Sequence, residues 1–303
     1  MCPYRNNIMN NRQFLKYMQY LEFGRPPHEF WGSTDLNQNL EYLEEGGPFD
    51  NTSTPRKYSD INNYDQIIYN YSIMRSGSTL LKQIMSEIFD YQKILYFYKW
   101  PRFKLFNPPQ ACHSPIIMTY RDFRDVILST RRMRLSMHGL TKEESFRHLP
   151  TKKEILLLAE REVIPQINGF EAVSTMAKDR ILMLRYEDFY GNYDHIFDKF
   201  ESFFNSESYS EILKHHDHHN GLQISPDMRK RLKLKFSFEN NFKKTEAHKN
   251  FRSWDTNTKS GLSLHGDHMN SGVLEEWRGL PNDLSSYMTE ILYPYLQRWG
   301  YEK

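Results

Sequence analysis

The chain has 303 residues, a length that suits one large domain or two small ones. Its 40 Lys and Arg residues nearly balance 38 Asp and Glu residues, and a formal net charge of +2 excludes a broadly cationic nucleic-acid-binding surface. Two cysteines cannot form a disulfide framework, no apolar run approaches the ~20 residues of a membrane span, and the first residues contain no hydrophobic signal core. We therefore expect a cytoplasmic protein without nucleic-acid or membrane partners, in which any anion-binding site is local.

The first 65 residues are rich in aromatic residues and Asn and are interrupted by pairs of Pro and Gly. We expect irregular structure there, with a short helix at about residues 11–23. Regular patterns follow. A strand is predicted at residues 66–72 and a helix from Thr79 onward. Two further strands are predicted at 93–98 and 115–120, and a basic helix at 123–136.

The second half of the chain continues the alternation. Residues 154–176 are predicted to form a helix that is interrupted or ended near Pro165, because proline lacks a backbone donor. A fourth strand at 180–186 precedes helices at 193–204, 226–238 and 283–299, with a polar insertion at about 205–265. This order predicts a single α/β domain of residues 1–303. Its three layers are a central parallel sheet and a layer of helices on each face of that sheet. Ligands of such folds bind at the carboxyl edge of the sheet, which points to the loops 72–79 and 120–123.

The first of these loops contains Arg75-Ser76-Gly77-Ser78-Thr79, between a predicted strand and a predicted helix. Backbone N–H groups, the helix N-terminus, the Arg75 guanidinium and three hydroxyl groups can all donate to phosphate or sulfate oxygens. An ordinary capped turn has the same composition, so the loop alone leaves both interpretations open. The lysine of the pattern G-x-x-x-x-G-K-[ST] is absent, which argues against a Mg-nucleotide triphosphatase.

The second loop begins with Arg121 at the end of a predicted strand, and the helix that follows carries Ser129, eight residues further on. Eight residues are about two helical turns, so one anionic group could meet both side chains. Asp122 and Asp125 lie in the first turn, where negative charge suits the helix dipole. A solvated basic helix with local ion pairs is the alternative, supported by the arginines that follow in the same segment.

Together the two segments resemble the sulfotransferase family that uses 3′-phosphoadenosine-5′-phosphosulfate (PAPS). The P-loop-like phosphosulfate-binding loop of that family is matched by residues 75–79, and its 3′-phosphate segment by Arg121 and Ser129. The matches run in family order from about residue 66 to 280.

Two later stretches are also similar to the family. Arg185-Tyr186-Glu187-Asp188 matches a family stretch whose aromatic residue lies near the adenine, here Tyr186. Ser271 and Gly272, followed by Glu276-Trp277-Arg278, match a C-terminal stretch that closes over the 3′-phosphate. Where the family has a basic pair before the glycine, this chain has Asn270-Ser271, and Arg132 and Arg278 are candidates to replace it.

The resemblance implies transfer of a sulfuryl group from PAPS to a hydroxyl or amine of a small-molecule acceptor, such as a natural product. Adenosine 3′,5′-bisphosphate (PAP) would be the product, and no metal would take part. Arg75 would take the role of the family's loop lysine, and residues 1–65 would lie on the acceptor side. The family's dimerisation pattern does not follow Trp277, which leaves the oligomeric state open.

The expected general base is where the chain departs from the family. Lys99 occupies the position of the family's catalytic His. It acts as a base only if its pKa falls; otherwise it neutralises sulfuryl oxygens or is a surface lysine. His28, His113 and His138 are alternative bases.

Two other functions and two other features remain open at this stage. A P-loop nucleotide or small-molecule kinase and a catalytically inactive sulfotransferase-like binding protein are the alternative functions. The histidines of residues 215–219 form either a metal site or, as we expect, a solvated helix end. The basic run 229–235 is either a solvated helix face or a surface for an acidic partner.

Overall fold

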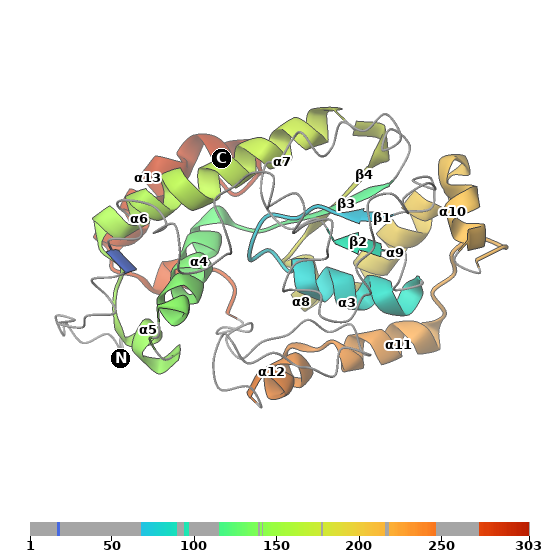
Figure 1. The fold of residues 1–303 in the computed structure, drawn as a ribbon, viewed down its shortest axis with the longest axis horizontal. Helices are drawn as coiled ribbons and strands as arrows, with labels where there is room; N and C mark the ends of the chain where they lie inside the picture. Colours follow the sequence, from blue (N-terminus) through green and yellow to red (C-terminus); the bar gives the residue numbers. More distant parts are fainter. Residues whose placement is uncertain are drawn as a thin grey trace, which may run out of the picture.

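Four short strands form one parallel sheet in the computed structural model, which describes residues 17–18, 68–89, 94–96, 115–138, 140, 142–176, 178–215, 218–246 and 273–302. They are β1 (Ile68–Asn70), β2 (Ile94–Tyr96), β3 (Ile116–Tyr120) and β4 (Ile181–Arg185), arranged in the order β2-β1-β3-β4 (Figure 1). Every neighbouring pair is parallel. The four predicted strands and their parallel pairing are thus confirmed.

Helices occupy most of the remaining described chain. They are α3 (Ser78–Ile88), α4 (Phe123–Met137), α5 (Lys142–Arg147), α6 (Lys152–Leu158), α7 (Ile164–Met176), α8 (Asp188–Gly191), α9 (Tyr193–Phe204), α10 (Ser210–His215), α11 (Pro226–Lys235), α12 (Phe238–Glu246) and α13 (Asn282–Arg298). Within the described residues, none of them is both long enough and apolar enough to cross a membrane.

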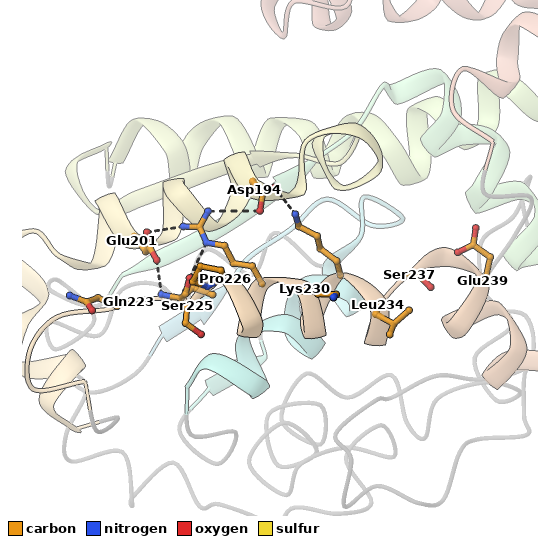
Figure 2. A pocket seen from close by; sticks show the side chains of 12 residues that line it. Asp194, Glu201, Gln223, Ser225, Pro226, Lys230, Leu234, Ser237 and Glu239 are labelled. Atoms are coloured by element: carbon orange, nitrogen blue, oxygen red, sulfur yellow. Dashed lines mark hydrogen bonds and ion pairs between the residues drawn. The ribbon is translucent and has the colours of Figure 1, made fainter.

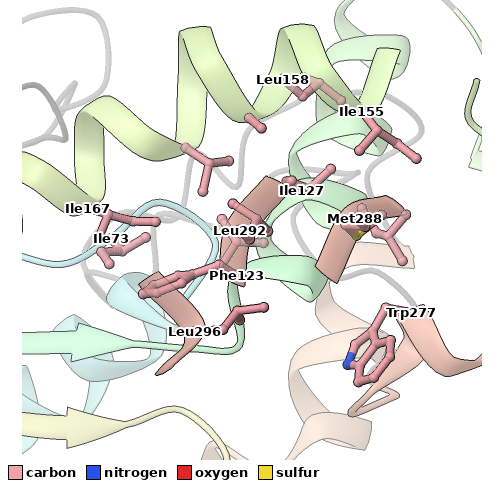
Figure 3. Packing of buried hydrophobic residues seen from close by; sticks show 14 of the residues in the cluster. Ile73, Phe123, Ile127, Ile155, Leu158, Ile167, Trp277, Met288, Leu292 and Leu296 are labelled. Carbon is pink, nitrogen blue, oxygen red and sulfur yellow. The ribbon is translucent and has the colours of Figure 1, made fainter. Parts of the chain in front are cut away.

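The sheet lies between two groups of helices, because successive side chains of a strand point to opposite faces (Figure 1). Ile116 and Met118 of β3 pack with α4, α6, α7 and α13, whereas Ile117 packs with α3, α9, α10 and α11. Figure 3 shows the first of these cores, where Phe123, Ile127 and Leu292 meet. Full burial of one such aliphatic or aromatic side chain contributes about 1.5–3 kcal/mol.

The last helix shows how sequence spacing dictates this packing. Leu284, Met288, Leu292 and Leu296 follow each other at intervals of four residues, and all four are buried on one face of α13. The predicted apolar stripe of this helix therefore lies in the core.

The helical segment is interrupted near Pro165, as predicted, but it does not end at the proline. A π-helical turn, Ala159–Val163, lies between α6 and α7, and Pro165 itself lies inside α7. At the end of this turn the Ile164 N–H donates to the Ala159 carbonyl, five residues back. The wider turn directly before the proline accommodates the missing donor and the ring, so the chain continues as a helix.

A difference from the prediction concerns the helix predicted at 226–238. It ends at Lys235, and a new helix, α12, begins at Phe238. The Ser237 hydroxyl accepts a hydrogen bond from the Asn240 N–H at 3.2 Å, which caps the new helix. The predicted helix at 11–23 lies outside the described residues apart from Tyr17 and Met18, which are helical.

Candidate functional site

The loop between β1 and α3 is anchored to the neighbouring strand β3. The Ile73 N–H donates to the Thr119 carbonyl at 3.0 Å, beyond the last strand pairing. The Ser76 hydroxyl lies within 2.5 Å of the Ile73 carbonyl and within 2.9 Å of both oxygens of Thr119, and Ser76 is fully buried. Its hydroxyl therefore holds the turn to β3.

Buried polar side chains support the loop from below. Asn70 Nδ2 donates to the Ser78 carbonyl at 3.0 Å, and the Ser72 hydroxyl bridges Asn70 Oδ1 at 2.8 Å and the Thr119 N–H at 3.1 Å. All of these residues are buried. A satisfied buried network of this kind makes the path of the loop unique.

Backbone strain is concentrated near this loop. Among the described residues other than glycine, only Arg75 (φ 66°) and Glu275 (φ 54°) have a positive φ. A left-handed conformation costs an L-residue about 1–2 kcal/mol, and such strain gathers at functional sites. The strained Arg75 is the residue expected to meet the sulfuryl group.

Tyr186 closes over the same loop from the end of β4. Its N–H donates to the Tyr120 carbonyl at 2.8 Å, which places it directly after the strand. A Cβ on Gly77 would lie 2.5 Å from Tyr186 Cδ2, and Gly77 has φ 87°. Only glycine therefore fits at this position of the loop.

Arg121 extends from the end of β3 beside Tyr186. Its Nη2 donates to Asp125 Oδ2 at 2.8 Å and to the Val273 carbonyl at 3.1 Å, and its Cζ lies 4.7 Å from the centre of the Tyr186 ring. Its Nε is buried and has no hydrogen-bond partner in the described part of the chain. Burial alone would lower the pKa of Arg121, but the Asp125 carboxylate outweighs this and the pKa is raised.

The two segments singled out in the sequence meet in space. Arg75 Nε donates to the Ser129 hydroxyl at 2.9 Å, across 54 residues of sequence. The β1–α3 loop and the buried face of α4 therefore form a single site.

Asp125 joins residues 273–277 to this site. It accepts the Glu275 N–H at 2.9 Å and the Trp277 N–H at 3.3 Å, in addition to Arg121. Burial raises the pKa of Asp125, and Arg121 opposes that rise. Asp122 and Asp125 lie at the start of α4, as predicted: Asp122 is the N-cap and accepts the Arg124 N–H at 3.0 Å, and Asp125 is in the first turn.

This architecture is similar to that of two crystal structures of retinol dehydratase. One, in complex with retinol and PAP, has 15% sequence identity and a TM-score of 0.50, covering 89% of this chain and 97% of that chain. The other, in complex with androsterone and the inactive cofactor PAP, has 15% identity and a TM-score of 0.49, with 89% and 96% covered. The fold resembles that of sulfotransferases. No model of a known protein family matches the sequence, and no curated protein matches it.

Within this sulfotransferase-like fold, Arg132 and Arg278 differ in their surroundings. Arg132 is buried on α4 and forms a bidentate pair with Glu276 at 2.5 and 2.7 Å. Arg278 is exposed and pairs with Glu275 at 2.9 Å. Of the two candidates to replace the family's basic pair, only Arg132 lies in the buried layer that contains Arg121.

Trp277 fastens the same C-terminal stretch to α4. Its ring lies under the Arg124 guanidinium, with Cζ 3.5 Å from the ring centre. Arg124 is in turn paired with Asp122 at 2.7 Å and with Glu302. This stacking fixes residues 273–277 against the start of α4.

Several predicted site residues lie outside the described residues: Lys99, Ser271, Gly272, His28 and His113. His138 is described; it ends α4, at the opposite end of the helix from Arg121, with its ring centre 6.0 Å from that of Tyr17.

His218 of the histidine-rich stretch makes a packing contact. His218 Nε2 is 2.8 Å from the Ile88 carbonyl, and its ring meets the edge of Phe89 with 5.7 Å between centres. Within the described ranges, no group of three or more His, Cys, Asp or Glu side chains is arranged to hold a metal ion.

The basic run 229–235 lines a surface groove of about 1160 Å³ between α9 and α11 (Figure 2). Arg229 pairs with Asp198 at 2.6 Å and with Glu201 at 2.9 Å, and Lys233 pairs with Asp194 at 2.5 Å. Acidic side chains of α9 thus neutralise much of this run, which favours the interpretation as a helix face over a surface for an acidic partner.

Sequence reasoning missed one residue that supports the loop. Gln166 of α7 is buried, and its Oε1 accepts the Met74 N–H at 2.9 Å from a position 92 residues away. A polar residue on the otherwise apolar face of a predicted helix was the available signal, because a buried amide needs a partner.

Proposed function

We propose that this protein is a PAPS-dependent sulfotransferase that transfers the sulfuryl group to a hydroxyl or amine of a small-molecule acceptor. The contact between Arg75 of the loop and Ser129 of α4 carries the proposal, because it unites the two anion-binding segments expected from the sequence. The similarity to a fold crystallised with PAP supports it.

The residues fit such a nucleotide. Residues 75–79, at the N-terminus of α3, would hold the 5′ end, and Arg121 with Ser129 would hold the 3′-phosphate. The buried Nε of Arg121, which has no partner among the described residues, is a charged donor without an acceptor. The ring of Tyr186 would face the adenine, and Ser271 and Gly272 would complete the 3′-phosphate site.

The bound donor would supply an activated sulfuryl group, joined to the nucleotide as a mixed phosphate–sulfate anhydride. Arg75 stays protonated at any physiological pH, so its contribution is electrostatic: its guanidinium stabilises negative charge that develops on the leaving oxygen. The N–H groups at the start of α3 add to this effect. No proton is taken from Arg75.

Activation of the acceptor is assigned to Lys99. A lysine accepts a proton only when its pKa is lowered, which nearby positive charge such as Arg75 would achieve. Lys99→Ala should reduce turnover, and Lys99→His should restore part of it. An unchanged rate in Lys99→Ala would remove Lys99 from the mechanism and leave activation to another base or to an amine acceptor.

Calorimetry and thermal shift with PAP and with Mg-ATP test the proposed function. PAP should bind and raise the Tm in the absence of metal. Stabilisation by Mg-ATP and not by PAP would instead identify a kinase. Turnover of sulfur-labelled PAPS across a panel of phenols, alcohols and amines then separates an enzyme from an inactive binding protein, since the latter binds PAP and transfers nothing.

A further inference from the structure

One face of α4 carries a row of buried polar residues. Asp125, Ser129 and Arg132 are spaced at 4 and 3 residues, so they fall within about 60° of one another around the helix, and Arg121 lies directly before the N-cap of α4. The exposed fractions of Arg121, Asp125, Ser129 and Arg132 are 7%, 2%, 3% and 7%. The sulfotransferase resemblance accounts for Arg121 and Ser129, Asp125 binds the segment 273–277, and Arg132 is so far only a candidate to replace the family's basic pair.

Arg132 shares one feature with Arg121. Its two Nη atoms are taken by Glu276, while its Nε is buried and has no hydrogen-bond partner among the described residues. Few buried N–H groups in native structures lack a hydrogen-bond acceptor. A buried guanidinium N–H without one therefore indicates a position where a ligand oxygen can bind. Two of them, one directly before α4 and one on its buried face, define a place where acceptor oxygens are missing.

The charges of this face favour an anion. Arg75, Arg121 and Arg132 contribute three positive charges, against the carboxylates of Asp125 and Glu276. Burial lowers the pKa of Arg132, Glu276 opposes this, and the positive charges of Arg121 and Arg131 lower it further. Arg132 lies about one helical turn beyond Ser129 on this face of α4.

We propose that Arg132 is the second guanidinium of the 3′-phosphate subsite and that Glu276 is the counter-ion that holds it there. The proposal rests on the proposed function. It adds the residue that replaces the positive charge of the family's basic pair. Asn270-Ser271 occupy the position of the family's basic pair, and Arg132 supplies a cation from α4 instead. The subsite thereby selects nucleotides that carry a dianionic phosphomonoester at the 3′ position.

Calorimetry with PAP and with adenosine 5′-monophosphate tests this assignment, because the two ligands differ by the 3′-phosphate. Arg132→Gln should weaken PAP binding about tenfold or more and leave adenosine 5′-monophosphate within about twofold. Glu276→Gln should strengthen PAP binding several-fold, because it removes the carboxylate that competes for Arg132. Arg132→Lys, which keeps the charge without the fork, should lie between wild type and Arg132→Gln.

Arg134→Gln is the matched control, since Arg134 lies on another face of α4 in a buried pair with Glu162 at 2.7 Å. It should reduce stability without changing the ratio of the two affinities. The assignment is wrong if both Arg132→Gln and Glu276→Gln weaken the binding of PAP. It is also wrong if each variant weakens the binding of PAP and of adenosine 5′-monophosphate by the same factor. In either case the pair only holds the segment 273–277 in place. If wild type does not bind PAP at all, the proposed function itself fails.

Discussion

The ring of Tyr186 lies so close to Gly77 that a Cβ there would be 2.5 Å from Cδ2 and 2.8 Å from Cε2. This contact joins the loop after β1 to the residue after β4, two segments separated by more than a hundred residues. It leaves no space for a side chain at the centre of the proposed phosphosulfate loop.

Gly77→Ala should therefore lower the free energy of unfolding by about 1–3 kcal/mol, through the positive φ and the displaced ring. PAP affinity should fall as well, because Tyr186 and the loop must both move. Urea denaturation and calorimetry measure the two effects. Gly191→Ala is the matched control, since nothing lies within 4 Å of a Cβ at that position; equal stability of both variants would contradict the prediction.

Arg75→Ala should reduce turnover of PAPS by about 10²–10³-fold, the usual effect of removing a donor to developing negative charge. PAP should still bind, because Arg121 remains. Arg75→Gly should be more stable than Arg75→Ala, by about 1 kcal/mol, because glycine adopts φ 66° without strain. Single-turnover kinetics and chemical denaturation measure these effects, and turnover close to wild type would exclude Arg75 from catalysis.

Glu154→Gln should cost about 3–5 kcal/mol of stability. Glu154 is completely buried and accepts from Arg131 Nε at 3.0 Å, so its removal leaves a buried guanidinium uncompensated. Asp283→Asn disrupts an exposed pair with Lys152 at 3.9 Å and should change stability by less than about 1 kcal/mol. Similar losses in both variants would show that burial does not govern the strength of these pairs.

Tyr71 should make stability sensitive to alkaline pH. Burial raises the pKa of Tyr71 from 10.0 to about 12. Its contribution is therefore fully present below pH 10 and is lost as the pH rises through 12, because the unfolded chain ionises first. The stability of wild type relative to Tyr71→Phe should fall between pH 10 and pH 12 in urea denaturation; a constant difference would contradict the shift.

Local pattern was sufficient for the elements and for part of the site. The strands and helices follow from apolar spacing of 2 and 3.6, and residues 75–79 and Arg121 follow from their places after predicted strands. Parallel strands bring such loops to one edge of the sheet, as the sequence predicted, and the structure shows that Arg75 and Ser129 meet there. The π-helical turn before Pro165 was missed, because such a turn has no signature in a single sequence.

The hydrogen-bond partners of the buried polar groups could not be predicted from the sequence. Met74 meets Gln166 across 92 residues, Asp125 meets Glu275 across 150, and Arg132 meets Glu276 across 144. Spacing along a chain states which side chains share a helix face, since that relation is local. Which carboxylate or carbonyl each of them meets depends on how whole helices pack, and burial then sets the strength of the contact. Residue order thus sufficed for most helices, for the strands and for the two loops at the carboxyl edge of the sheet, whereas packing alone selected the charges that surround these loops.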